Sequence, residues 1–211
     1  MIDPRELEDE PALTKTLEAA GFELTVRPGT WTMKSTSVQI DLLVPSALGG
    51  SGRRGARLGK HGNEVARKTQ GLEACVVDHS PFAITALDPS DHRSFEILVA
   101  GPAALLVAKL HKIAERKDDY DRIQDKDGLD VLRILQASDS AYLALKLKQL
   151  CTHQIAAEVT RAARTFLVDL FSDRKSVGAQ MAVRSSRGLV DGETIALSCE
   201  VLASKLLEGW E

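Results

Sequence analysis

Apolar residues recur every three or four positions through most of the second half of the chain. Such spacing places side chains on one face of a helix, and it predicts a helical region from about residue 140 to residue 208. Two apolar stripes support this prediction, and they consist of Ile155, Val159, Ala162, Ala163, Phe166 and Leu170, and of Ile195, Cys199, Leu202 and Leu206. Two earlier helices are predicted over 102–116, with Pro102 in a tolerated first-turn position, and over 127–137.

The first hundred residues follow a different pattern, in which short apolar or alternating segments lie between turn-forming residues. The amphipathic segment 11–20 predicts a helix that ends at Gly21. Strands are predicted over 22–27, 31–33, 37–44, 75–77, 82–87 and 95–99. Because strands and helices occur in separate blocks, we expect an α+β fold, with a small mixed sheet and flanking helices followed by an all-helical C-terminal region. We place the division between a mixed part, 1–100, and a helical part, 101–211.

The composition narrows the class of protein. Hydrophobic residues make up 44% of the 211 positions but aromatic residues only 4%, which favours aliphatic helix packing over aromatic surfaces that stack nucleic-acid bases. The longest apolar stretch, 97–110, is interrupted by Gly101-Pro102 and contains Lys109, so no membrane segment is expected. The acidic N-terminus lacks the features of an export signal, and we expect a cytoplasmic protein.

The cysteines and histidines show no spacing typical of a metal site or a disulfide framework. We interpret the cysteines as small buried groups, and His111 as a surface or packing residue of its helix. The residues concerned are Cys75, Cys151 and Cys199, and the histidines at 61, 79, 92, 111 and 153.

A glycine-rich basic loop lies within residues 45–71. Its cations are opposed only by Glu64. A segment of this kind is commonly a solvated surface loop, but its charge also suits contact with phosphate groups or RNA. The candidate contacts are Arg53, Arg54, Arg57 and Lys60.

The segment 109–130 contains the most informative chemistry. Lys109, Lys112 and Arg116 share one face of the predicted helix 102–116, opposite its apolar residues. Asp127 and Asp130 stand three positions apart at the start of the next helix, where carboxylates also cap free amides. One of these carboxylates would orient Lys109 or Arg116 toward a phosphate, whereas the alternative is an ordinary solvated helix face.

Asp41 is the third candidate. It is flanked by Ile40 and by Leu42 in a predicted strand, where a buried carboxylate needs a partner or a metal, although simple exposure also explains it.

Taken in chain order, these features resemble the minimal nucleotidyltransferase superfamily. They are a helix ending in Ala-Ala-Gly-Phe, a strand with Trp31, the strand Ile-Asp-Leu-Leu-Val-Pro, the helix Gly-Pro-Ala-Ala-Leu-Leu-Val-Ala-Lys-Leu-His, Arg116, and Lys-Asp-x-x-Asp from Lys126. Over about residues 12–137 the chain is most similar to the bacterial abortive-infection nucleotidyltransferase toxins of the AbiEii type.

The resemblance implies a metal-dependent transfer of a nucleotide from an NTP to an acceptor, which in several of these toxins is tRNA, and a cognate antitoxin as a partner. Mg²⁺ or Mn²⁺ would neutralise the phosphates while fixed cations stabilise the pyrophosphate that leaves. Asp41 would be the catalytic metal ligand, Lys109, Lys112 and Arg116 would hold the triphosphate, and Lys126, Asp127 and Asp130 would form the supporting acidic motif.

One part of the family pattern has no counterpart in this sequence. The family begins with a Gly-rich turn and an Asp-x-Asp pair that supplies two metal ligands, and no such motif precedes Asp41. Either the chain starts downstream of the catalytic motif, or it is a homologue that has lost the reaction. In both cases we expect the chain to bind NTP without transferring it, because one carboxylate does not organise a two-metal site.

Three hypotheses of function follow. The first is a nucleotidyltransferase-like protein with an incomplete catalytic set. The second is a non-catalytic nucleotide- or RNA-binding protein, and the third is a helical partner or antitoxin-like protein that uses residues 140–208. Binding through phosphates weakens steeply with salt, whereas apolar helix packing does not, so salt dependence separates the last two.

Overall fold

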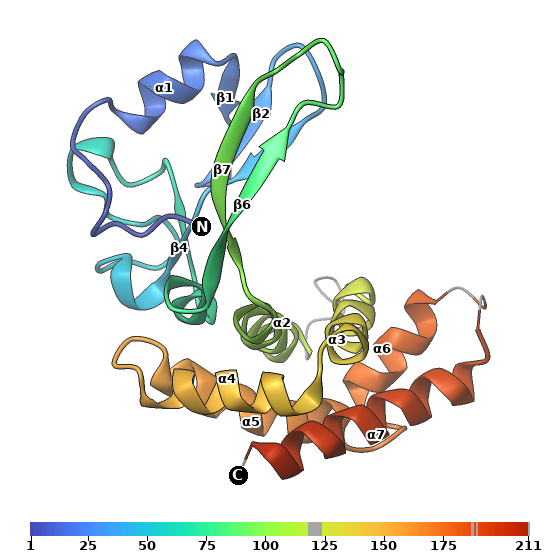
Figure 1. Ribbon diagram of the computed structural model, residues 1–211. Coiled ribbons are helices and arrows are strands. Elements are labelled where there is room, and N and C mark those ends of the chain that lie inside the picture. The colour runs from blue at the N-terminus through green and yellow to red at the C-terminus, as the bar shows by residue number, and fades with distance from the viewer. Residues whose placement is uncertain (118–123, 187, 189, 211) are drawn as a thin grey trace. The chain divides into compact units, whose positions relative to one another are not determined.

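The computed structural model describes residues 1–117, 124–186, 188 and 190–210. The chain divides into two compact units, Met1–Glu73 and Ala74–Glu211, and each is described by itself. The first contains short strands and one short helix, and the second contains a β-hairpin followed by helices (Figure 1). The predicted α+β class, with small sheets and a helical C-terminal region, is confirmed.

The first unit is built from two small sheets. After α1 (Leu13–Ala19), an antiparallel sheet contains, in the order β1-β2-β3, the strands Phe22–Leu24, Thr30–Met33 and Gln39–Asp41. The second sheet pairs β4 (Leu43–Pro45) with β5 (Arg67–Thr69) in parallel. Short 3₁₀ turns span Ser46–Leu48, Gly59–His61 and Leu72–Val76.

Trp31 lies at the centre of the core of this unit. Its side chain is fully buried, together with Val44, Val65 and Ala66 from the second sheet and its connection. The indole N–H donates a hydrogen bond of 3.0 Å to the carbonyl of Val65, which satisfies the one polar group of the ring. The core therefore joins the two small sheets around one large side chain.

The second unit begins with a hairpin, β6 (His79–Thr85) and β7 (Ser94–Ala100), paired over seven residues of each strand. Six helices follow among the described residues: α2 (Pro102–Arg116), α3 (Lys126–Ala137), α4 (Ser140–Thr152), α5 (Ala157–Phe171), α6 (Val177–Ser185) and α7 (Gly192–Gly209). Helix α2 packs against α3 and α5, α6 contacts α3 and α7, and α4 runs beside α7. None of the helices in the described part of the chain combines the length and hydropathy needed to cross a bilayer.

Asp78 joins the hairpin to helix α2. Its carboxylate accepts a hydrogen bond of 3.0 Å from the amide of Ala104, and its carbonyl accepts one of 2.8 Å from the amide of Gly101. A Cβ on Gly101 would lie 2.4 Å from the carboxylate oxygens, so glycine permits this approach. The hairpin consequently belongs with the helices, and the two units divide after Glu73, whereas the sequence places the division at residue 100.

The sequence predicts the helices better than the strands. The predicted helix 102–116 matches α2, and 127–137 matches α3 to within a residue. The predicted strand 75–77 is wrong, because Leu72–Val76 forms a 3₁₀ turn. The predicted strand 37–44 is two short strands in different sheets, and β5, which lies in the basic segment, was not predicted.

Gly128 generates a prediction about the packing of α3 on α6. A Cβ at this position would lie 2.6 Å from the Cβ of Met181 and 2.7 Å from the carbonyl oxygen of Gly178. Because the oxygen belongs to the backbone of α6 and cannot rotate away, we expect Gly128→Ala to lower the free energy of unfolding by about 1–3 kcal/mol in urea titrations.

Gly192→Ala is the control for this substitution. The nearest atom to an added Cβ there is a side-chain methyl of Val183, at 3.0 Å, which can move. We expect little change in the free energy of unfolding of this variant. Equal losses in the two variants would contradict the close α3–α6 approach as the cause.

Candidate functional site

Four charged side chains form a network between α2 and α3, which we call the α2–α3 network: Lys109, Lys112, Asp127 and Asp130. The ammonium of Lys109 lies 3.0 Å from the Asp127 carboxylate and 2.7 Å from that of Asp130. The ammonium of Lys112 lies 2.9 Å from Asp127. The two carboxylates therefore fix Lys109, and Asp127 links both lysines.

Local sequence explains why these groups meet. Leu106, Leu110 and Ile113 bury one face of α2, so Lys109 and Lys112 lie beside that face rather than within it. Asp127 stands in the first turn of α3, where the helix dipole favours a carboxylate. The packing of α2 against α3 then brings the two sets of charges into contact.

The network changes the protonation of its members. The Asp127 side chain is only 2% exposed. Burial by itself would raise the pKa of Asp127, but hydrogen bonds from Lys112 and Lys109 outweigh it, so the pKa is lowered. Burial would likewise lower the pKa of Lys109, yet its bonds to Asp130 and Asp127 raise that pKa. Lys109 and Asp127 are therefore held in their ionised forms near neutral pH.

Arg133 of α3 adds positive charge next to the network, and Arg116 ends helix α2. Arg133 lies 3.6 Å from Asp130 and is largely exposed. Arg116 lies on α2 seven residues after Lys109, and its Nε atom is buried with no hydrogen-bond partner among the described residues. Arg133 therefore adds a third cation beside the two carboxylates.

Lys126, which the resemblance places in the acidic motif, begins α3 and is exposed. It contributes no ion pair to the α2–α3 network in the described part of the chain. Its neighbour Asp125 instead binds Arg184 of α6, with a shortest distance of 2.7 Å. This α3–α6 ion pair was not predicted, because 59 residues separate its partners and no sequence pattern links them.

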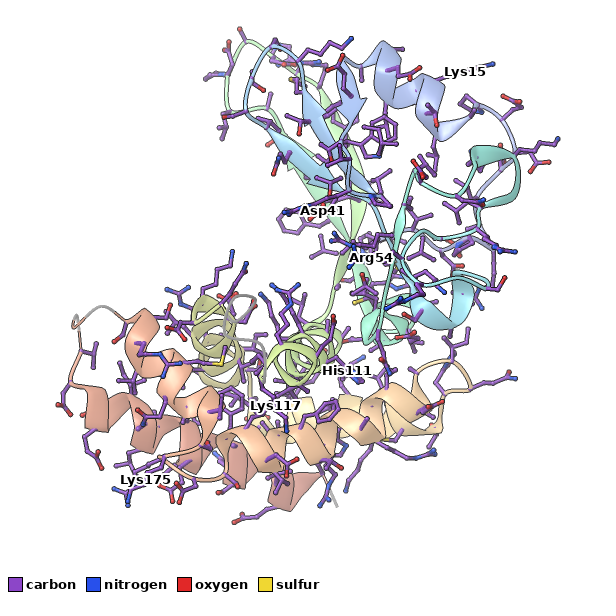
Figure 2. The ribbon with its side chains drawn as sticks, turned by 180° about the vertical axis from the view of Figure 1, so that it is seen from behind. Lys15, Asp41, Arg54, His111, Lys117 and Lys175 are labelled. Carbon is purple, nitrogen blue, oxygen red and sulfur yellow. The ribbon has the colours of Figure 1, made fainter. Side chains whose placement is uncertain are left out.

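Asp41 lies in β3 in the first unit (Figure 2). One carboxylate oxygen accepts a hydrogen bond of 2.7 Å from the Thr30 hydroxyl, and the other lies 3.7 Å from the guanidinium of Arg67. These surroundings do not fit a divalent cation, since a guanidinium stands where a further anionic ligand would be needed. Among the described residues, no group of three or more acidic, histidine or cysteine side chains is placed to hold a metal.

The basic loop of the first unit presents Arg53, Arg54 and Arg57 on the surface (Arg54 is labelled in Figure 2). Its fourth candidate, Lys60, forms a 2.9 Å ion pair with Asp9. The loop backbone is anchored, because the ammonium of Lys68 donates hydrogen bonds to the carbonyls of Gly50 and Gly52. Three arginines therefore project from a loop whose backbone is held in place.

The histidines near these sites have structural roles. His111 on α2 (Figure 2) is buried, as a packing role predicts. Its Nε2 donates a hydrogen bond of 2.8 Å to the carbonyl of Val159. Its ring meets Phe166 edge to face at 5.1 Å between centroids. His61 is also buried, between the amide of Leu13 and the carbonyl of Glu8.

The cysteines follow the prediction only in part. Cys75 and Cys199 are buried, and burial raises the pKa of the Cys199 thiol to about 11. Cys151 is only half-buried, so the prediction of a buried group is wrong for this residue, which lies near the end of α4.

Comparison of the chain with known proteins gives no match to a family model, a curated protein or a solved structure. The resemblance to nucleotidyltransferases therefore stays a prediction that depends on the residues of this chain.

We expect Asp127→Asn to lower the free energy of unfolding at pH 7 by about 2 kcal/mol. This loss is smaller than the roughly 3–5 kcal/mol expected when one partner of a fully buried ion pair is removed, because both lysines are partly exposed to solvent. The pKa of Asp127 is lowered from 3.8, so its stabilisation exists above that pH and is lost as the pH falls through the lowered value. The difference in the free energy of unfolding between the variant and the original chain, measured by urea titration, should therefore become smaller at acid pH.

Asp169→Asn is the matched control, because Asp169 is an exposed carboxylate of α5. Its free energy of unfolding should be unchanged at both pH values. A loss in Asp127→Asn that is equally large at pH 7 and below pH 3.8 would show that the ion pairs do not cause it.

Proposed function

We propose that this protein is a nucleotidyltransferase-like protein that binds the phosphates of an NTP at the α2–α3 network and does not transfer the nucleotide. The observation that carries the proposal is the fixed position of the Lys109 ammonium between Asp127 and Asp130, at 3.0 and 2.7 Å. A cation held by two carboxylates is already oriented when a ligand arrives, so less conformational entropy is lost on binding.

The lysines keep hydrogen-bond capacity for such a ligand. An ammonium has three N–H donors, and Lys109 directs two of them to Asp130 and Asp127. The side chains of Lys109 and Lys112 are 26% and 30% exposed, so their remaining donors are open to solvent. Arg133, 3.6 Å from Asp130, supplies further positive charge. A polyphosphate would offer acceptor oxygens to these donors.

Binding without transfer follows from the acidic residues. Phosphoryl-transfer sites that use two metal ions need several carboxylates around them. Asp41 has a hydroxyl and a guanidinium as its nearest partners. The function supported by these residues is therefore recognition of the nucleotide, supplied as its magnesium or manganese complex, and no catalytic step is assigned to Asp41.

Lys112→Gln tests the nucleotide site. Loss of one charge-assisted bond to phosphate should weaken ATP binding about tenfold in isothermal titration calorimetry with magnesium. Lys146→Gln, which removes the same charge from α4 beside Tyr142, is the control and should bind ATP like the original chain. Equal affinities of the two variants would remove the α2–α3 network from the proposal.

Mixing the original chain with magnesium, an α-labelled NTP and tRNA tests the absence of nucleotide transfer. We expect no label on the RNA or on the protein. Label on either one would contradict the proposal, and loss of that label in Asp41→Ala would then place Asp41 in a metal site.

A second candidate function is RNA binding by the basic loop of the first unit. The observation that favours it is the anchored loop backbone, with Lys68 bonded to the carbonyls of Gly50 and Gly52 while Arg53 and Arg54 project outward. An anchored loop presents its guanidiniums to a phosphate backbone with a smaller entropic loss than a free one.

Salt dependence tests this second function. If Arg53 and Arg54 each contact one phosphate, Arg53→Gln combined with Arg54→Gln should reduce the slope of log affinity against log salt by about 2. Fluorescence anisotropy with a labelled single-stranded RNA measures the slope. Lys34→Gln is the control, since Lys34 lies outside segment 45–71 and pairs with Glu23. An unchanged slope in the double variant would exclude the loop as the RNA contact.

A further inference from the structure

The hairpin of the second unit, β6 and β7, is exposed along almost its whole length. All seven residues of β6 and six of the seven in β7 are exposed. The two strands lead away from helix α2, which follows β7 in the chain (Figure 1). A two-stranded hairpin is marginally stable by itself and usually needs a third strand or a packed helix. The described hairpin therefore lacks the packing that such an element normally has.

The register of the two strands separates an apolar face from a mixed one. Residues that pair across an antiparallel ladder point to the same face of the sheet, and successive residues of a strand alternate between faces. Ser80 pairs with Val99, Phe82 with Ile97, and Ile84 with Phe95. These six side chains share one face, which we call the hairpin face, and none of them is charged.

The hairpin face is large enough for an interaction site. Its five apolar side chains are 40–60% exposed, and the two phenylalanines are the most exposed of them. Together they leave about 450 Å² of surface in water, which is the size of patch that is often functional. Two such faces packed together would bury about 900 Å² from these residues alone, and their neighbours would bring the total toward the roughly 1,200–2,000 Å² of a specific interface.

The chemistry of the hairpin face favours a second copy of this chain as its occupant. In a dimer with two-fold symmetry a patch meets itself, so every charge on it meets a like charge. The hairpin face carries no charge and avoids this repulsion. A negatively charged membrane is a poorer occupant, because Asp88 and Asp91 lie in the turn of the hairpin with a single arginine, Arg93.

We propose that two copies of this chain pack their hairpin faces against each other, with the two-fold axis close to the middle pair, Phe82 and Ile97. Sheets that pack face to face lie about 10 Å apart, and their inward side chains fill the space between them. Phe82 and Phe95 supply the largest part of the buried area. The dimer does not depend on the nucleotide proposed for the α2–α3 network.

Sedimentation equilibrium of the full chain measures this association. We expect a dimer whose dissociation constant is of order 10 μM. Phe95→Ser should raise the dissociation constant at least about thirtyfold, because each copy then loses an aromatic side chain from the interface. A chain that stays monomeric throughout the concentration range would overturn the proposal.

Leu98→Ser is the matched control for Phe95→Ser. Leu98 is also 60% exposed and also lies in β7, but its partner Pro81 places it on the opposite face. We expect this variant to dimerise like the original chain. Equal weakening in the two variants would overturn the proposal, because association would then follow from general apolar exposure rather than from the hairpin face.

Charge complementation distinguishes a lost interface from a lost fold. Ile97→Lys and Ile97→Glu should each be monomeric, because like charges would meet near the two-fold axis. An equal mixture of the two variants should recover the dimer, since opposite charges then meet. Misfolded variants would not recover it, and circular dichroism of each variant checks the fold. A mixture of folded variants that stays monomeric would overturn the proposed arrangement.

Vesicles of phosphatidylcholine and phosphatidylserine test the competing occupant. We expect the original chain to remain in the supernatant when these vesicles are sedimented. Sedimentation of the original chain with the vesicles, and its loss in Phe95→Ser, would overturn the proposal and assign the hairpin face to a lipid surface.

Discussion

The burial of Asp127 is the constraint on which the α2–α3 pairing depends. Its side chain is only 2% exposed, and an unpaired carboxylate in that position would be costly. Lys109 and Lys112, which both lie on α2, offset this cost by forming ion pairs with the carboxylate at 3.0 and 2.9 Å. Helices α2 and α3 must therefore keep one relative position, since sliding either helix by a turn would separate the carboxylate from its partners.

That fixed position links packing to recognition. Gly128, next to Asp127, lets α3 approach the backbone of α6 more closely than any other residue would permit. Arg184 of α6 holds the preceding Asp125, so the first turn of α3 is fixed from two sides. The lysine donors that remain open to solvent are consequently held in a rigid frame. Such a frame is the feature that a phosphate-binding site requires and that a solvated helix face lacks.

The candidate sites differ in how far they could be predicted from the sequence. The sequence suggested that Asp127 or Asp130 orients Lys109 or Arg116 across the helix pair, and the structure contains this contact for Lys109, whereas the contact of Lys112 with Asp127 was not predicted. Asp41 was predicted as a carboxylate in a strand. Its partner Arg67 lies in β5, a strand that was not predicted because the basic, glycine-rich composition of its segment indicates a loop.

The sequence by itself determined the helices, the α+β class and the faces of α2, because helical periodicity is a local property that each segment carries alone. It also determined which charges were available for the α2–α3 network. Only the tertiary structure decided the division after Glu73, the split of 37–44 between two sheets and the burial of Asp127. These features depend on contacts between residues distant in the chain. The free energy of such contacts comes from packing and desolvation, which no single segment specifies.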